Sequence, residues 1–257
     1  EKIDCYKKII ALDPIDPRAF HSLGDVYSSF DEVKSKMYWE MAMRRYSEKI
    51  ESFNDSASEY LKRSENSEQP KIESKDVFRE VGQCFYGLGE VHDNLHKYSH
   101  ATDAYKKALK MDPTHVDCLY DLAMSLFHEK KLEESKKYLL EFLAKQSSYV
   151  GHYSLGLIFA GEGCIKEALG EFWNCIELTQ DGSVSDYYRG ISYHHLGNMK
   201  LAEKYLKLSI AKDPEDLGAI QTLIQLYESN GEGQKAYEYY EQIRAKKETL
   251  RSMRETM

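Results

Sequence analysis

The stretch GQCFYGLGEVHDNLHKYSHATDAYKKALKMDP, residues 82–113, decides the fold because it contains two short amphipathic helices followed by a stop signal. The first helix has an apolar stripe at helical spacing, with a small residue where a neighbouring helix can approach closely. That stripe consists of Phe85, Leu88, Gly89 and His92. The second stripe has spacings of four and three and consists of Ala101, Tyr105 and Ala108. Asp112-Pro113 ends this helix, since proline disfavours helix in the residue before it.

The same helix-pair pattern recurs at a regular interval along the rest of the chain. Successive units begin near Gly82, Val116, Tyr149, Ser183 and Leu217, so the offsets are 34, 33, 34 and 34 residues. A glycine falls between the two helices of three of these units, at Gly163, Gly197 and Gly231, where a left-handed residue closes a helix at low cost. One such pair cannot bury its own apolar face, so the units are expected to stack on one another.

The order of aromatic or apolar residue, Leu-Gly, aromatic residue, Ala-x3-Tyr and proline resembles the tetratricopeptide repeat (TPR). The resemblance implies an all-α, right-handed superhelical solenoid of antiparallel helix pairs. It covers most of the chain and is strongest over residues 82–113. We therefore expect function to reside in the stack of units. The composition, with 15 Gly and only 5 Pro, is typical of an all-helical chain.

The pattern divides the chain into four segments. Residues 1–30 hold a partial repeat, whose first helix is absent, and the first helix of the next repeat. We therefore expect the chain to be a fragment or to have an unusual start. Residues 31–81 break the period, and their apolar spacing predicts one long irregular helix from about Glu32 to Lys62, followed by a polar loop over residues 64–74. Residues 82–250 hold five regular repeats, and residues 251–257 form a helical tail.

Two interpretations of the insertion at residues 31–81 remain open. It is either a structural variation of the array or an extra wall or lid on a binding face. The basic tail is expected to extend the last helix, although basic tails can also dock on acidic partners.

Composition limits the classes of function. The formal charge of −8 argues against nucleic acid as a partner, because its binding depends on Lys and Arg neutralising phosphates. Five cysteines without paired short spacings indicate reduced thiols and favour an intracellular, cytoplasmic location. No apolar run approaches the length of a membrane-spanning helix, which argues against membrane insertion. The sequence contains no motif that predicts a bound cofactor or metal ion.

In the family that the chain resembles, the first helix of each pair lines the inside of the superhelix and contacts ligands. The fifth, ninth and twelfth residues of each unit are therefore the candidates, and four consecutive units have tyrosine at the fifth position. Tyrosine combines a rigid ring with a hydroxyl and suits the binding of a peptide. The predicted peptide-binding residues are Tyr86, Tyr120, Met124, Phe127, Tyr153, Leu157, Tyr187, Ile191 and His194. An alternative of equal weight is that these tyrosines pack between adjacent first helices.

The sequence argues against two other kinds of site. Chaperone-binding members of the family hold a C-terminal carboxylate with Lys, Asn and Arg, whereas this chain has Tyr, Glu, Met and Leu at the comparable positions. The adjacent pair His194-His195 cannot face one metal from one side of a helix, and CxxC, HExxH and phosphate-loop motifs are absent from the sequence. Cys84 and Cys118 fall at equivalent repeat positions, which predicts a packing role.

These observations predict a non-enzymatic adaptor or scaffold that binds peptide segments of protein partners in an apolar, tyrosine-lined concave groove. Two alternatives remain. The chain is a non-catalytic substrate-recognition or regulatory domain of a larger enzyme, or it is a structural subunit of a multiprotein assembly that acts through its convex surface.

Overall fold

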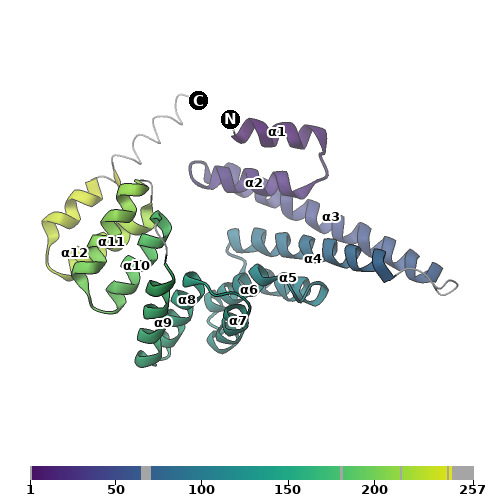
Figure 1. The fold of residues 1–257 in the computed structure, drawn as a ribbon. Coiled ribbons are helices and arrows are strands. Elements are labelled where there is room, and N and C mark those ends of the chain that lie inside the picture. Colours follow the sequence, from purple (N-terminus) through teal and green to yellow (C-terminus); the bar gives the residue numbers. More distant parts are fainter. Residues whose placement is uncertain (1, 65–70, 180–181, 215, 242, 245–257) are drawn as a thin grey trace. The chain divides into compact units, whose positions relative to one another are not determined.

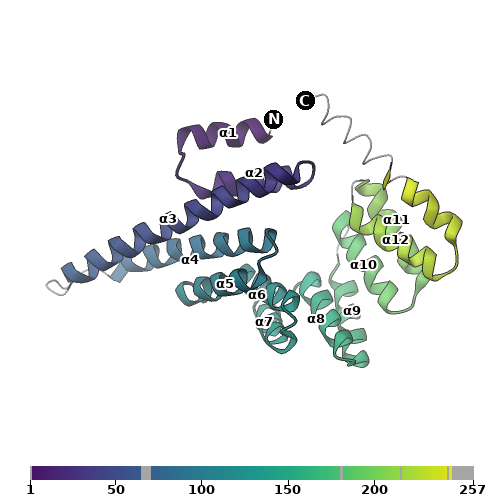
Figure 2. The same cartoon turned by 180° about the vertical axis from the view of Figure 1, so that it is seen from behind.

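The computed structural model describes residues 2–64, 71–179, 182–214, 216–241 and 243–244, and every regular element among them is helical (Figures 1 and 2). The helices are α1 Lys2–Leu12, α2 Pro17–Ser28, α3 Glu32–Ser64, α4 Lys71–Asn94, α5 Tyr98–Met111, α6 Val116–His128, α7 Leu132–Lys145, α8 Tyr149–Gly161, α9 Ile165–Leu178, α10 Ser183–His195, α11 Met199–Lys212 and α12 Leu217–Ser229. Residues 233–241 form further helical turns. The chain divides into two compact units, residues 1–142 and residues 143–257, and each is considered by itself. The all-α fold class is confirmed.

Four of the five repeat starts that the sequence predicts coincide with helix starts, whereas Gly82 lies inside α4, which begins at Lys71. Helices α6, α8, α10 and α12 begin at the four predicted residues after Gly82. Side chains directly before these helices cap three of the starts, and His115 Nδ1 accepts a hydrogen bond of 3.2 Å from the Cys118 amide at the start of α6. Ser148 Oγ accepts a hydrogen bond of 3.4 Å from the Gly151 amide, and Asp216 accepts one of 2.9 Å from the Ala219 amide. Each bond satisfies a donor that the first helical turn leaves unpaired.

The glycine between the two helices of a pair adopts the left-handed conformation, as predicted. Gly163, Gly197 and Gly231 have φ values of 78°, 74° and 76°. His96 and Lys130 occupy the same place in two earlier pairs, with φ values of 56° and 65°. The turn therefore keeps its geometry where the residue is not glycine, although a side chain makes this conformation less favourable.

The predicted long helix is present as α3, which extends to Ser64, two residues beyond the predicted end. The loop differs from the prediction, because α4 begins at Lys71 and residues 71–74 are helical. The rest of the predicted loop, residues 65–70, lies outside the described residues, as does the tail at 251–257.

The small residue of the repeat allows close packing of each helix pair. A methyl group at Gly89 would clash with the ring of Tyr105 on α5, and one at Gly156 would lie 2.7 Å from the ring of Phe172 on α9. Tyr105 and Phe172 are both fully buried. The predicted close approach at these positions is confirmed.

The N-terminal unit has a core in two clusters of buried residues. The first joins α2, α3 and α4 and contains Phe20, Ala42, Tyr46, Ile50, Cys84 and Val91. The second joins α5 and α6 and contains Ala101, Tyr105, Ala108, Cys118, Leu122 and Leu126. Cys84 and Cys118 are buried at equivalent places in these clusters, and burial raises the pKa of both thiols. Both cysteines therefore have the packing role that the sequence predicts.

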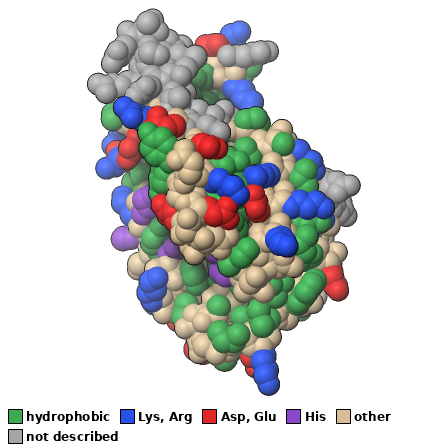
Figure 3. Space-filling model, turned by 90° about the vertical axis from the view of Figure 1, so that its left-hand side faces the viewer, with side chains coloured by type: hydrophobic (Ala, Val, Ile, Leu, Met, Phe, Trp, Pro, Cys, Tyr) green, Lys and Arg blue, Asp and Glu red, His purple; other side chains and the backbone are tan. Residues whose placement is uncertain are grey.

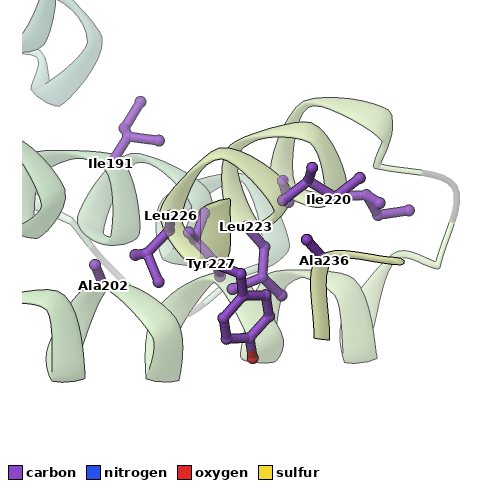
Figure 4. Packing of buried hydrophobic residues seen from close by; sticks show 10 residues of the cluster. Ile191, Ala202, Ile220, Leu223, Leu226, Tyr227 and Ala236 are labelled. Carbon is purple, nitrogen blue, oxygen red and sulfur yellow. The ribbon is translucent and has the colours of Figure 1, made fainter. Parts of the chain in front are cut away.

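The C-terminal unit has its own core around α12. Figure 4 shows Leu223, Leu226 and Tyr227 of this helix beside Ile191 of α10 and Ala202 of α11. All five residues are at most 4% exposed. Each unit thus buries the apolar stripes of its helices against neighbouring pairs.

Candidate functional site

A cavity of about 610 Å³ opens on the first-helix side of the N-terminal unit, between α2, α3 and α4. The candidate positions of two successive first helices meet there. These positions are the fifth and ninth residues of the units, His21 and Asp25 on α2 and Tyr86 and Glu90 on α4. The long helix α3 contributes Tyr46 and Lys49 to the wall.

Tyr86 connects two first helices of this unit. Its hydroxyl donates a hydrogen bond of 2.7 Å to Asp121 on α6, and its ring lies 4.4 Å, centroid to centroid, from the ring of His115. Burial, followed by the charge of Asp121, raises the pKa of this tyrosine well above its usual range. Tyr86 therefore packs between adjacent first helices, as the alternative interpretation predicts, and still lines the cavity.

Carboxyl groups from neighbouring first helices gather on this face. Burial, together with the charges of Asp121 and Asp25, raises the pKa of Glu90 to about 7. Burial also raises the pKa of Asp121 to about 6, against a hydrogen bond from Tyr86 that lowers it. Among the described residues, no ion pair with Lys, Arg or His reaches Glu90, Asp93 or Asp121. These three carboxyl groups therefore have no ion-pair partner within the described residues, although Arg18, His21 and Lys49 also line the cavity.

Neutral donors hold two of these carboxylates in place. Asp93 accepts bonds from the Tyr105 hydroxyl at 3.0 Å and from Ser125 Oγ at 2.7 and 2.8 Å. Asp25 accepts bonds from Trp39 Nε1 at 2.9 Å and Asn94 Nδ2 at 3.2 Å. These bonds fix the direction of each carboxylate without neutralising its charge.

Three more predicted residues lie on α6 in the same unit. The ring of Tyr120 lies 5.3 Å from that of Phe142, and Tyr120 is half-buried. Met124 lines a second cavity of about 620 Å³, together with Trp39 and Asp93. Phe127 is half-buried, with its ring 5.9 Å from that of His128. Tyr120 is thus in part a packing residue, whereas Met124 faces a cavity.

The predicted tyrosines of the C-terminal unit belong to an aromatic cluster on α8 and α10. Tyr153 lies 5.3 Å from the ring of Tyr188 and 5.7 Å from that of Phe172. Tyr187 lies 5.4 Å from Tyr188, and a methyl group at Gly218 would lie 3.4 Å from its hydroxyl. Both predicted tyrosines are half-buried, so they pack against neighbouring helices and still expose part of their rings.

The remaining predicted residues of this unit differ in exposure. Leu157 and His194 are half-buried, and the ring of His194 lies 5.9 Å from that of His195. Ile191 is 4% exposed and packs in the core, so it offers almost no surface to a ligand. We do not retain Ile191 in the proposed site.

Sequence reasoning overlooked several residues of these faces. They are Asp121, Trp39, Asn94, Tyr188 and His195. Asp121 and Tyr188 directly follow the predicted fifth-position tyrosines Tyr120 and Tyr187, and this adjacency could have identified them. Trp39 reaches the face only because α3 packs against α2, which no local pattern reveals.

The described residues offer neither a membrane-spanning helix nor a metal site. No described helix combines the length and apolar character needed to cross a membrane. Within the described ranges, His, Cys, Asp and Glu side chains form no group of three or more that could hold a metal ion.

On the face of the molecule in Figure 3, acidic and basic side chains are interspersed with hydrophobic ones.

The fold and its faces define the class of all-helical repeat proteins built from antiparallel helix pairs. Residues 82–115 and 104–137 each match a family model described as tetratricopeptide repeat. Residues 82–137 therefore match the tetratricopeptide repeat, the family that the sequence of this chain resembles.

Known proteins agree with this assignment. The chain is similar to the TPR repeat-containing protein MJ1428 of Methanocaldococcus jannaschii, with 26% identity over 177 residues, which cover 65% of this chain and 30% of that protein. It thus spans less than a third of that relative. TTC0263, a TPR protein of Thermus thermophilus, has a similar structure with a TM-score of 0.55, 22% identity and coverage of 63% of this chain and 89% of that one.

A TPR protein from Parabacteroides merdae has a TM-score of 0.54 at 16% identity, with coverage of 93% of this chain and 79% of that one. At these identities the structural likeness concerns the fold. The family matches and this fold support a role in protein–protein interaction or as a scaffold.

Proposed function

We propose that the protein is an adaptor or scaffold that binds segments of partner proteins on the faces of its first helices. The observation that supports this most is the convergence of fifth and ninth repeat positions on the 610 Å³ cavity between α2 and α4. These are the positions that the family pattern assigns to ligand contact. A cavity of this size accommodates several atoms of a bound segment.

The C-terminal unit supports the same proposal with different chemistry. The exposed parts of Tyr153 and Tyr187 combine an apolar ring with a hydroxyl that can donate to a backbone carbonyl. Rings packed edge to face hold each other in place, so binding a segment costs little side-chain entropy. We therefore propose a tyrosine-lined site on α8 and α10 and a polar site on α2 and α4.

Quantitative affinity capture from extracts of the protein's own cells, followed by binding of overlapping peptides from the captured proteins, tests this proposal. Tyr153→Ala with Tyr187→Ala is expected to weaken at least one partner peptide tenfold or more. Trp173→Ala is the matched control, because Trp173 is 50% exposed on α9, a second helix. If peptides bind all variants alike, or if only Trp173→Ala weakens binding, the proposed site on α8 and α10 does not bind them and that part of the proposal fails. A circular-dichroism melt of each variant excludes unfolding as the cause.

A further inference from the structure

The cavity between α2, α3 and α4 contains a tyrosine hydroxyl without a protein partner. Tyr46 lines the cavity and is 5% exposed, and no hydrogen bond joins its hydroxyl to a described residue. The hydroxyl lies against Gly87 of α4, where a methyl group would come within 2.5 Å of it. The side chain is buried, and its hydroxyl is free to bond a polar group of a ligand that enters the cavity in place of water.

The α4 side of the same cavity is negatively charged. Glu90 lines it from α4 and Asp25 lines it from α2, and the charge of Asp25 acts directly on Glu90. Asp121 adds a further negative charge from α6. Two carboxylates that repel each other in a partly buried cavity favour a cation between them.

The basic residues of the cavity wall supply little of that positive charge. His21 Nε2 lies 3.7 Å from Asp25 Oδ1, but burial lowers the pKa of His21, which favours its neutral form. Arg18 is held by Asp16, which accepts from its Nε at 3.0 Å and from its Nη2 at 2.5 Å. The charge of Lys49 favours the ionised forms of Asp16 and Cys84, and no ion pair joins Lys49 to Glu90 among the described residues. The cavity thus has positive charge near Asp16 and uncompensated negative charge at Glu90.

We propose that the cavity between α2, α3 and α4 receives a lysine or arginine side chain of a bound partner segment, with Glu90 and Asp25 as its anionic acceptors and the Tyr46 hydroxyl as a neutral acceptor. This inference rests on the proposed function and specifies the chemistry of the partner. The cation has up to five N–H donors in arginine or three in lysine, and the oxygens around the cavity accept them. The net charge of −8 of the chain also attracts a basic segment to this face.

The proposal implies that binding depends on pH. A bound cation requires the ionised form of Glu90, whose pKa is about 7, so it must displace a proton at lower pH. The affinity should therefore rise between pH 6 and pH 8. The titratable and charged groups around Glu90 are Arg18, His21 and Asp25 on α2, Tyr46 and Lys49 on α3, Glu80, Cys84, Tyr86 and Asp93 on α4, Tyr105 on α5, His115 before α6, and Cys118 and Asp121 on α6.

Nuclear magnetic resonance titration of the full chain with defined peptides tests the inference. The probes are four acetylated, amidated pentapeptides of Gly and Ser whose central residue is Arg, Lys, Gln or Glu. The Arg and Lys peptides are expected to shift the side-chain carboxyl resonances of Glu90 and Asp25 and to bind at least fivefold more tightly at pH 8 than at pH 6. The Gln and Glu peptides are expected to leave these resonances unchanged.

Matched variants separate charge recognition from other effects. Glu90→Gln is expected to weaken the Arg peptide at least tenfold and to remove its pH dependence, and Tyr46→Phe is expected to weaken it severalfold. Glu177→Gln removes one exposed charge of the C-terminal unit and should change neither the affinity for the Arg peptide nor its pH dependence.

Three results overturn the inference. They are equal binding of the Gln peptide, unchanged binding by the Glu90→Gln variant, and binding of free spermidine at the cavity to the exclusion of the Arg and Lys peptides. If partner segments from the capture experiment lose affinity with the Tyr153 and Tyr187 variants but not with Glu90→Gln, the adaptor function stands and this inference alone fails.

Discussion

The hydroxyl of Tyr86 on α4 donates a 2.7 Å hydrogen bond to Asp121 on α6, which ties two successive first helices together. Asp121 is half-buried and has no ion pair among the described residues, so this bond is a principal stabilising contact of its carboxylate. A tyrosine at a repeat position that the family uses for ligands therefore also holds the stack together.

Removing the Tyr86 hydroxyl should destabilise the protein. Tyr86→Phe leaves the Asp121 carboxylate without its donor, and we expect a loss of about 1–3 kcal/mol in the free energy of unfolding at pH 7.5. Urea denaturation monitored by circular dichroism measures it. Tyr237→Phe, at a residue that is 57% exposed, is the control and should change the value by less than about 0.5 kcal/mol. Equal stability of the Tyr86 variant and the wild type would show that the bond is not needed.

The contribution of Glu90 and Asp121 to stability should fall as the pH rises from about 4 to 8. The pKa of Glu90 is raised to about 7 and that of Asp121 to about 6, both above the values of an unfolded chain. The folded state therefore binds more protons, and this stabilisation is complete below the unfolded pKa values and is lost as the pH passes the folded ones. Glu90→Gln removes the larger of these two pH-dependent contributions. The free energy of unfolding of the variant at pH 8 should therefore exceed that of the wild type by on the order of 1–3 kcal/mol. Urea denaturation at pH 5 and pH 8 measures this. If the variant's gain in unfolding free energy over the wild type is larger at pH 5 than at pH 8, the raised pKa of Glu90 is contradicted.

The small residue of the repeat signature should not tolerate a methyl group. Gly89→Ala places one against the buried Tyr105 ring, and overpacking of this kind costs about 1–3 kcal/mol. Thermal unfolding is expected to show a lower melting temperature. Gly161→Ala serves as the control, because a methyl group there meets nothing within 4 Å. An unchanged melting temperature of the Gly89 variant would mean that α4 and α5 can move apart without cost.

The glycine turn between the paired helices should be sensitive to substitution for a different reason. Gly197 has a φ of 74° and open space around its Cα, so Gly197→Ala adds strain without a clash and should cost roughly 1 kcal/mol. Gly170 lies inside α9 with equally open space, so Gly170→Ala should instead stabilise by roughly 0.5–1 kcal/mol. Opposite signs in urea denaturation confirm that backbone conformation decides the effect, and equal signs refute it.

Local patterns in the sequence predicted the helix pairs because their causes are local. The four helix starts from Val116 to Leu217 follow from apolar spacing, and three of them also have capping side chains. Three of the left-handed turns follow from glycine. Residues 71–74 were wrongly expected to form a loop, since polar composition does not separate an exposed helical turn from a loop. The candidate site was less predictable. The repeat pattern identifies the fifth residue of each unit as a candidate for ligand contact, but it does not show which side chains surround that residue.

The sequence by itself determined the class of fold, since each helix pair is defined by residues within one period of about 34. Only the tertiary structure decided which first-helix residues share a cavity, which pack and which are buried. Tyr46 and Glu90 are far apart in the sequence, and they meet because α3 packs against α4. Ile191 has the same periodic position as Glu90 yet lies in the core. Exposure and charge at a repeat position depend on the neighbouring helices, and the repeat pattern alone does not contain that information.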